Sequence, residues 1–405
     1  MADEIIVYLD DYKYDGDGNY DILYLDFRTS SDFEKYLNAV GIKERTSGSY
    51  LEILGYRSPK RLKRGAYYTL NVDMLKQLKP EPHNNSLILS QTYNFGQYEG
   101  ENDVNYRLLQ NHSQLDPTEF SATFHNPLEG FEELGRYVNI EFRVNNVSQA
   151  NWNEILEDGV VKYVYDIGAP IYASVSEVQR YIDAYATTYA ETKPVLVLSH
   201  WDKDHYHCLL KMTDAEINNF SKFVCVDNKK SNMSKNLYER IERILGRGRV
   251  FNIAMPARMP NTNFPQMREK YSDEVIALYV GEKSRETNYS GIILYAQGSS
   301  GNVILSGDSL PVQASQVLMN RMLYEGKPKC SHYLVVPHHG GDFTRKTYKI
   351  YHITANINPV EAIISVDAAN NTYGHPRQEI LDWLRSLANW QIMRTDNNGT
   401  LKRAL

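Results

Sequence analysis

Five short apolar runs after residue 190 constrain the fold of this chain more than any other feature. They are VLVLS, GIILYA, NVILS, YLVVP and AIISV. Strands that are apolar along most of their length must be covered on both faces. The amphipathic segments SEVQRYIDAYATTYAE and RQEILDWLRSLA predict helices among these strands. We therefore expect an α/β domain over residues 136–405, in which two packed sheets lie between outer helices.

The first part of the chain has a different character. Residues 1–132 contain aromatic and β-branched runs separated by Gly, Asn and Asp clusters, which predicts a strand-rich α+β accessory domain of unknown role. Within it, DGDGNYD resembles a calcium loop, but Tyr20 stands where such a loop requires glycine, so a hairpin turn is the favoured interpretation. A length of 405 residues is sufficient for two such domains.

Composition argues against several classes of protein. No stretch approaches the roughly 20 apolar residues of a membrane span, and the N-terminus does not resemble a secretory signal. The three cysteines are widely spaced and include no CxxC pair, which argues against a disulfide framework or a cysteine zinc site. We therefore expect a soluble, cytoplasmic protein with no membrane partner. The net charge of −6 favours solubility but identifies no partner.

One polar loop concentrates residues that bind metal ions. SHWDKDH directly follows a predicted buried strand, and the segment after it predicts a helix. Within six residues the loop offers two imidazoles and two carboxylates, those of His200, Asp202, Asp204 and His205. These donors suit zinc, manganese or iron, and they exceed what one tetrahedral ion takes from a single loop. The loop therefore predicts a site for two divalent ions, Zn²⁺ or Mn²⁺.

The H-x-D-x-D-H spacing resembles the signature loop of the metallo-β-lactamase superfamily, in the form found in ComEC-type competence hydrolases. Further segments resemble the family pattern in the same order: VNNVSQANW, YDIGAP, ETNYSGIIL, NVILSGDS, LVVPHHGGDFT and AIISVDAANNTYGHP. The first of them departs from the pattern, because Ser148 and Ala150 stand where glycines are expected. The resemblance covers residues ~138–390. It implies a four-layer αββα sandwich.

The resemblance also implies a role for each candidate residue. His200 and Asp202 would hold the first ion, and Asp308 would bridge the two ions. Asn288 stands where many relatives have a third histidine, and because an amide is a poorer zinc ligand, the first metal position is expected to be the weaker one. The second ion would be held by Asp204, His205 and either His375 or His338.

Other implied roles concern the surroundings of the ions. Asp166 would orient the ligand loop. For His339 two interpretations stay open. It could act at the metal centre, or it could be a structural histidine that is buried and bonded to a backbone carbonyl. The implied reaction is in-line attack by a bridging hydroxide on a phosphodiester. Catalytic roles then belong to Asp204, Asp308 and His338, with the histidine protonating the leaving oxygen.

The most basic stretch of the chain indicates which class of substrate the protein binds. Residues 222–270 contain 11 basic and four acidic residues. Arg247 and Arg249 follow a predicted helix that ends at Gly246, and there they could contact phosphates. This favours a nucleic acid or nucleotide as substrate. A solvated basic helix face is the alternative.

The sequence thus favours a metal-dependent phosphodiesterase, and a nuclease in particular, because the ComEC-like resemblance implies degradation of DNA. Two alternatives stay open. One is hydrolysis of a small nucleotide or another small ester or lactone, and the other is a catalytically degenerate interaction module. The accessory domain could in addition recruit a protein partner.

Overall fold

The computed structural model describes residues 4–14, 19–41, 51–57, 62, 66–72, 80–82, 91–94, 139–260, 262, 264–284, 287–321, 331–341, 358–367, 374–388 and 390–405. Contacts divide the chain into two compact units. The N-terminal unit comprises residues 1–125 and 229–240, and the sandwich unit comprises residues 126–228 and 241–405. The domain boundary predicted between residues 132 and 136 lies outside the described residues.

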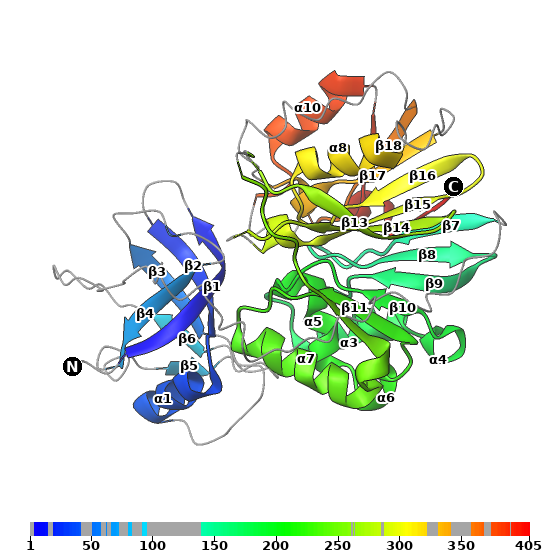
Figure 1. Cartoon of the computed structure of the whole chain (residues 1–405). Helices are drawn as coiled ribbons and strands as arrows, with labels where there is room; N and C mark the ends of the chain where they lie inside the picture. Colours follow the sequence, from blue (N-terminus) through cyan, green and yellow to red (C-terminus); the bar gives the residue numbers. More distant parts are fainter. Residues whose placement is uncertain are drawn as a thin grey trace. The chain divides into compact units, whose positions relative to one another are not determined.

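The N-terminal unit contains a mixed six-stranded sheet in the order β4-β1-β2-β3-β6-β5 (Figure 1). Its strands are β1 (Glu4–Tyr14), β2 (Asn19–Phe27), β3 (Leu51–Arg57), β4 (Tyr67–Asn71), β5 (Pro80–Pro82) and β6 (Gln91–Asn94). Helix α1 (Ser30–Val40) packs Tyr36 and Leu37 into the apolar core of the sheet. Strands β1 and β2 pair antiparallel, with Tyr14 opposite Tyr20, so the last three residues of DGDGNYD belong to β2. Residues 15–18 of the predicted turn lie outside the described residues.

Helix α7 (Asn232–Leu245) begins in the N-terminal unit. The carboxylate of Asp26 accepts a hydrogen bond of 2.9 Å from the backbone N–H of Met233, which satisfies one of the amides at the start of the helix. Lys235 donates through Nζ to the backbone carbonyl of Arg28 at 3.3 Å. Part of the basic stretch predicted to bind substrate therefore belongs to the N-terminal unit.

The sandwich unit contains two seven-stranded sheets. The first has the order β12-β11-β10-β9-β8-β7-β20, with β7 (Ile140–Val144), β8 (Asn153–Glu157), β9 (Val160–Tyr165), β10 (Val195–Val197), β11 (Lys222–Val226), β12 (Val250–Ile253) and β20 (Leu401–Ala404). The second runs in chain order, with β13 (Met267–Ser272), β14 (Ile276–Gly281), β15 (Ile292–Gln297), β16 (Gly301–Leu305), β17 (Ser331–Val335), β18 (Asn358–Ile364) and β19 (Gln391–Arg394).

Two apolar cores join these layers. One lies between the sheets, where Phe142 and Val197 of the first sheet meet Leu294 of the second. The other joins the opposite face of the second sheet to α8 (Pro311–Met319) and α10 (Gln378–Ala388). The outer face of the first sheet carries α3 (Val175–Tyr185), α4 (Tyr189–Thr192), α5 (Lys203–Lys211) and α6 (Asp214–Ile217) (Figure 1). The predicted four-layer αββα sandwich with an N-terminal strand-rich domain is confirmed.

The ends of parallel strands bring polar residues together. Strands β9 and β10 are parallel neighbours in the first sheet, and β16 and β17 are parallel neighbours in the second. Asp166 directly follows β9, and Asp308 and His338 each come three residues after β16 and β17. Ligands bind at the carboxyl ends of strands in α/β proteins, because loops converge there. Among the described residues, no helix is both long and apolar enough to cross a membrane.

Candidate metal centre

The predicted ligand loop leads from β10 into helix α5, as the sequence indicated. Asp202 is the residue before the helix, and Asp204 and His205 lie in its first turn. The loop after β9 is tied to this turn, because Ile167 N donates to the carbonyl of His205 at 2.9 Å. Gly168 N donates at 2.8 Å to the carbonyl of Asn151. Backbone hydrogen bonds thus fix the position of the ligand loop without the help of a metal ion.

His205 is held in a defined orientation by a carboxylate. Its Nδ1 lies 2.8 Å from Oδ2 of Asp166, and Asp166 itself accepts hydrogen bonds from both N and Oγ of Ser199. Asp166 has a positive φ of 61°, a conformation that a non-glycine residue adopts at a cost of about 1–3 kcal/mol. Since Nδ1 donates to Asp166, Nε2 is the nitrogen of His205 that is left to bind an ion.

Two further histidines follow the same pattern. Nδ1 of His200 lies 3.0 Å from Oγ of Ser199, and Nδ1 of His339 lies 2.9 Å from the backbone carbonyl of Ser365. A histidine that donates through Nδ1 presents the Nε2 lone pair to a ligand. For His339 the predicted alternatives are therefore not exclusive: the residue is buried and bonded to a carbonyl, and its other nitrogen is still directed into the centre.

The carboxylates lie opposite these nitrogens. Oδ1 of Asp308 is 3.1 Å from Nε2 of His205, and Oδ2 of Asp204 is 3.5 Å from Nε2 of His339. Oδ2 of Asp202 is 3.4 Å from Nε2 of His200. Two sets of ligand atoms each fall within 4.8 Å of one another: those of His200, His205 and Asp308, and those of Asp204, His205 and His339.

Divalent ions fit this arrangement. Four buried ligand atoms have no hydrogen-bond partner, namely Nε2 of His200, His205 and His339 and Oδ1 of Asp308. A buried polar atom left unsatisfied costs about 1–3 kcal/mol, so several such atoms converging on one point require a common partner. Imidazole and carboxylate together, without thiolate, suit zinc, manganese or iron. The chain therefore has histidine and aspartate groups that could hold metal ions.

The buried histidines and carboxylates of the centre shift one another's pKa values. Burial alone would lower the pKa of His205, but the carboxylates around it, Asp308 first among them, hold that pKa well above its usual range. Burial would likewise raise the pKa of Asp308, but the neighbouring histidines His338 and His205 hold it well below its usual range. Asp308 is therefore ionised and available as an anionic ligand.

His338 and His375 lie at the rim of the centre. Nδ1 of His338 is hydrogen-bonded to Oδ2 of Asp308, and the His338 side chain is 15% exposed, whereas that of Asp308 is fully buried. The ring of His375 lies 5.4 Å from the ring of His338. Both His338 and His339 have positive φ, 51° and 53°, which is uncommon for residues other than glycine. Neither His338 nor His375 falls within the two ligand sets, so their metal-binding roles stay predictions.

The side chain of Asn288 is hydrogen-bonded to a candidate ligand. Its Nδ2 donates to Oδ2 of Asp308 at 3.2 Å. The neighbouring Thr287, which the sequence did not single out, donates through Oγ1 to Oδ1 of Asp202 at 3.0 Å. Ser199 and Ser365 were also missed. Their contribution depends on hydrogen bonds between segments far apart in the chain, for which the sequence contains no local signal.

The two predicted substrate-binding arginines differ in their surroundings. Arg249 donates to the backbone carbonyls of Leu245 and Phe220 and to Oδ1 of Asn218. It therefore binds the carbonyl of the last residue of α7 and joins it to the segment between α6 and β11, which is a structural role. Arg247 is exposed. A substrate-binding role for either arginine stays a prediction.

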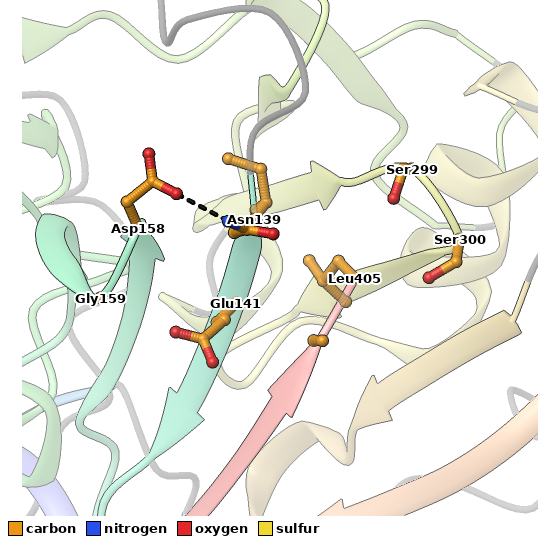
Figure 2. Close-up of a pocket in the computed structure, with 9 residues that line it drawn as sticks. Asn139, Glu141, Asp158, Gly159, Ser299, Ser300 and Leu405 are labelled. Carbon is orange, nitrogen blue, oxygen red and sulfur yellow. Dashed lines mark hydrogen bonds between the residues drawn. The ribbon is translucent and has the colours of Figure 1, made fainter.

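Figure 2 shows a pocket away from these residues, lined by Asn139, Ile140, Glu141, Asp158, Gly159, Ser299, Ser300, Ala404 and Leu405. Gly159 precedes the first residue of β9, and Ser300 precedes that of β16. Asp166 and Asp308, in contrast, come after the last residues of these strands. The pocket and the candidate metal centre therefore lie at opposite ends of the same strands.

Comparisons with known proteins assign no family to the chain. No family model matches it, and no curated protein matches it. Among solved structures, it is similar to CmlA, a diiron beta-hydroxylase from Streptomyces venezuelae, with 12% identity and a TM-score of 0.32 over 67% of this chain and 55% of that chain. A mutant of CmlA beta-hydroxylase matches with 10% identity and a TM-score of 0.34, over 99% of this chain and 76% of that one.

These comparisons correct the predicted relationship. The chain spans just over half the length of the first CmlA structure, and likeness at this level assigns no activity. The predicted place in a ComEC-like branch of the superfamily is wrong, since the similar structures are of CmlA and no family model supports that branch. The physical reason is that a short H-x-D-x-D-H loop specifies donor types and their spacing, which unrelated branches of a fold can share.

The contact between Asp166 and His205 gives a first prediction. Replacing Asp166 with asparagine removes the acceptor charge that fixes the Nδ1 proton of His205, so divalent ions should bind about 10–100-fold more weakly. Isothermal titration with Zn²⁺ measures this change. Asp183→Asn, on the exposed side of α3, is a matched control, because its side chain bonds only Gln179 in its helix. Unchanged zinc affinity in Asp166→Asn would show that Asp166 does not orient the ligand.

Proposed function

We propose that the chain is a metal-dependent hydrolase that cleaves phosphodiester bonds in nucleic acids or nucleotides. The observation that carries this proposal is the convergence of three buried, unpartnered histidine Nε2 atoms on the carboxylates of Asp204 and Asp308. When bound at such a centre, divalent ions lower the pKa of a water and neutralise the charge that develops on a phosphoryl group. The residues would hold Zn²⁺, Mn²⁺ or iron.

The protein's own contribution is to fix the donors before substrate arrives. Asp166 and the carbonyl of Ser365 determine which nitrogen of His205 and His339 bears the proton. Left-handed backbone at Asp166, His338 and His339 costs about 1–3 kcal/mol for each residue, and such conformations persist where the surrounding structure requires them. A donor set held in this way loses little entropy when it binds its ligands.

His338 is suited to hold a proton for the leaving group. Its Nδ1 donates to the buried carboxylate of Asp308, which fixes the orientation of the ring. Because the side chain is partly exposed, its Nε2 edge is the part of this histidine that can approach a substrate. In the proposed reaction, His338 donates the Nε2 proton to the departing oxygen, while His375 beside it contacts the phosphate.

The preference for an anionic polymer or nucleotide rests on charge. The stretch 222–270 carries a large excess of basic residues, of which the exposed Arg247 is the candidate to contact a phosphate. Because the guanidinium of Arg249 binds backbone carbonyls, we expect Arg249 to act on stability instead. A small ester or lactone would need no such basic stretch.

The test is an assay with chosen metals and substrates. Protein loaded with Zn²⁺, Mn²⁺ or Fe²⁺ is incubated with single-stranded DNA, duplex DNA, RNA, cyclic dinucleotides and a chromogenic phosphodiester, beside Asp204→Ala. We expect cleavage that depends on metal and is lost in the variant. Cleavage of small phosphodiesters alone would favour a nucleotide substrate. No cleavage of any phosphodiester under any loading would refute the proposal.

Metal binding should also stabilise the fold. An ion that binds only the folded state contributes about 2.7 kcal/mol when its concentration is 100 times its Kd. We therefore expect the melting temperature of chelator-treated protein to rise by several degrees when Zn²⁺ or Mn²⁺ is added, and Ca²⁺ to have a smaller effect because it prefers oxygen ligands. Differential scanning fluorimetry measures the shift. Equal shifts with all three ions would argue against a centre built from imidazoles.

A further inference from the structure

Cationic side chains from two distant segments of the chain lie together in the N-terminal unit. Nζ of Lys235 in α7 donates to the backbone carbonyl of Arg28, the residue that follows β2. The guanidinium carbon of Arg28 lies 5.8 Å from the centre of the Tyr67 ring, and the hydroxyl of Tyr67 donates to the backbone carbonyl of Lys230. These contacts bring the end of β2 and the start of α7 to one place, although 207 positions separate Arg28 and Lys235.

A further lysine belongs to the same place. Nζ of Lys229 lies 4.2 Å from the centre of the Tyr238 ring in α7. Burial lowers the pKa of Lys235, and the positive charges of Arg28 and Lys229 contribute to the decrease. The three charges therefore lie close enough to repel one another. Four partly exposed residues make up this α7 basic cluster, namely Arg28, Lys229, Lys230 and Lys235.

The two acidic residues that act on the α7 basic cluster are buried. Asp26 is 2% exposed, and its carboxylate accepts hydrogen bonds from the backbone N–H groups of Phe27 and Met233. Asp32 is 9% exposed and accepts one from the backbone N–H of Ile6 at 3.1 Å. Both carboxylates are thus occupied by amides below the surface. Four cations and two buried acids leave net positive charge at the surface of the cluster.

The first turn of α7 offers few amides to a ligand. The N–H of Met233 is bonded to Asp26, and that of Ser234 donates to Oγ of Ser231 at 3.1 Å. The N–H of Lys235 donates to the backbone carbonyl of Ser231 at 3.2 Å. A single phosphate at the start of a helix is held by amides that are still free. An anion at the α7 basic cluster must therefore be held by the cationic side chains, which come from two segments.

We propose that the α7 basic cluster is the surface on which the N-terminal unit binds the phosphate backbone of a nucleic acid. Lysine and arginine side chains from separate segments can pair with successive phosphates of one polymer. Contacts of this kind position a nucleic acid without reading its bases. The role of the N-terminal unit is then to retain a polymeric substrate on the protein. This inference rests on the proposed function only in that the substrate is a nucleic acid.

The cluster is distinct from the phosphate contact proposed for Arg247. Lys229–Arg240 belong to the N-terminal unit, whereas Arg247 follows the opposite end of α7 and belongs to the sandwich unit. Arg28 comes from outside the basic stretch 222–270, so the sequence alone did not place it with the lysines of α7. The N-terminal unit therefore carries a basic surface of its own.

The experiment measures binding while cleavage is prevented. Full-length protein in excess chelator is titrated into fluorescently labelled single-stranded or duplex DNA, and anisotropy gives the Kd at several salt concentrations. If each of the four cations neutralises one phosphate of a single strand, the logarithm of the binding constant should fall with that of the salt concentration with a slope of about −3. Absence of binding to either DNA at low salt would overturn the inference. Binding to phosphatidylserine vesicles but to neither DNA, or displacement of DNA by low millimolar inorganic phosphate, would also overturn it.

Charge reversal tests the cluster itself. Lys229→Glu should weaken the binding of single-stranded DNA by about tenfold or more and make the salt slope less steep by at least about 0.7. Lys270→Glu is the matched control, because Lys270 is exposed and lies in the same basic stretch but belongs to β13 of the sandwich unit. Its Kd should be unchanged. Equal weakening in both variants would assign the attraction to the net charge of the whole chain and overturn the inference.

A further variant acts in the opposite direction. Glu239 is exposed and lies four residues after Lys235, on the same face of α7. Glu239→Gln removes a negative charge beside the cluster, so the binding of DNA should tighten while the melting temperature changes little. Unchanged or weaker binding in this variant would contradict the place assigned to the nucleic acid.

Binding and cleavage are separate measurements. Lys229→Glu should cleave the chromogenic phosphodiester as the wild type does, because such a small substrate does not need the cluster. DNA binding in chelator by a protein that cleaves no phosphodiester would refute the proposed function and leave this inference standing. Cleavage of DNA by a protein whose DNA binding is unchanged in Lys229→Glu would refute this inference and leave the proposed function standing.

Discussion

Replacing Asp308 with alanine is expected to abolish metal-dependent hydrolysis, lowering kcat/KM by about 1,000-fold or more. The side chain of Asp308 contacts both ends of the centre: its Oδ1 lies 3.1 Å from Nε2 of His205, and its Oδ2 bonds His338. Alanine removes an anionic ligand and the acceptor that positions the proton donor. Metal centres contribute several kcal/mol of charge stabilisation, and each ~1.4 kcal/mol corresponds to a tenfold change in rate.

The variant should lose metal but keep its fold. The side chain of Asp308 belongs to neither apolar core of the sandwich, so its removal leaves the packing of both sheets intact. Circular dichroism should therefore match the wild type after chelator treatment. The melting temperature should fall modestly, because the buried His205 loses the carboxylate that contributes most to raising its pKa. Bound Zn²⁺ should fall well below one ion for each chain. Asp382→Ala, at an exposed position of α10, serves as the control. An Asp308→Ala protein with wild-type cleavage would exclude Asp308 from the reaction.

Much of the sandwich could be predicted because its strands are apolar on both faces. Runs such as GIILYA and NVILS can be stable only inside a layered structure, and β15 and β16 are indeed buried along their whole length. The N-terminal sheet was predictable only as strand-rich. Its order places β6 beside β3 and β1 beside β4, and pairing of strands distant in the chain has no local signal in a sequence.

For the metal centre, the sequence predicted which donor side chains would be available, but not which of them lie close to one another. The ligand loop was recognisable because metal-binding side chains are concentrated in it. Which carboxylate each of His338 and His339 approaches depends on two consecutive left-handed residues, and propensity does not predict such backbone in histidine. The role of Asn288 depends on its contact with Asp308, 20 residues away in the chain, where a hydrogen-bonding amide replaces the expected histidine ligand.

Gly168→Ala is expected to destabilise the sandwich unit and to dismantle the metal centre together. A Cβ on Gly168 would lie 1.8 Å from the backbone oxygen of Asp204 and 2.8 Å from that of Asn151, and neither backbone atom can rotate away. The loop after β9 would have to move, which breaks the hydrogen bond from Gly168 N to Asn151. Overpacking of this kind costs about 1–3 kcal/mol or more, equivalent to a loss of roughly 2–12 °C in melting temperature.

The effect on metal follows from the place of Gly168 in the chain. It lies two residues after Asp166, whose carboxylate orients His205, so displacement of the loop withdraws that carboxylate and should weaken Zn²⁺ binding by about 10–100-fold. Gly248→Ala is the matched control, because a Cβ there meets no atom within 4 Å and the backbone is not left-handed. Thermal melting and zinc titration of both variants decide the matter. Equal melting temperatures and equal zinc affinities for Gly168→Ala and Gly248→Ala would contradict this prediction. They would show that the close contact between Gly168 and the backbone of Asp204 does not hold the ligand loop in place.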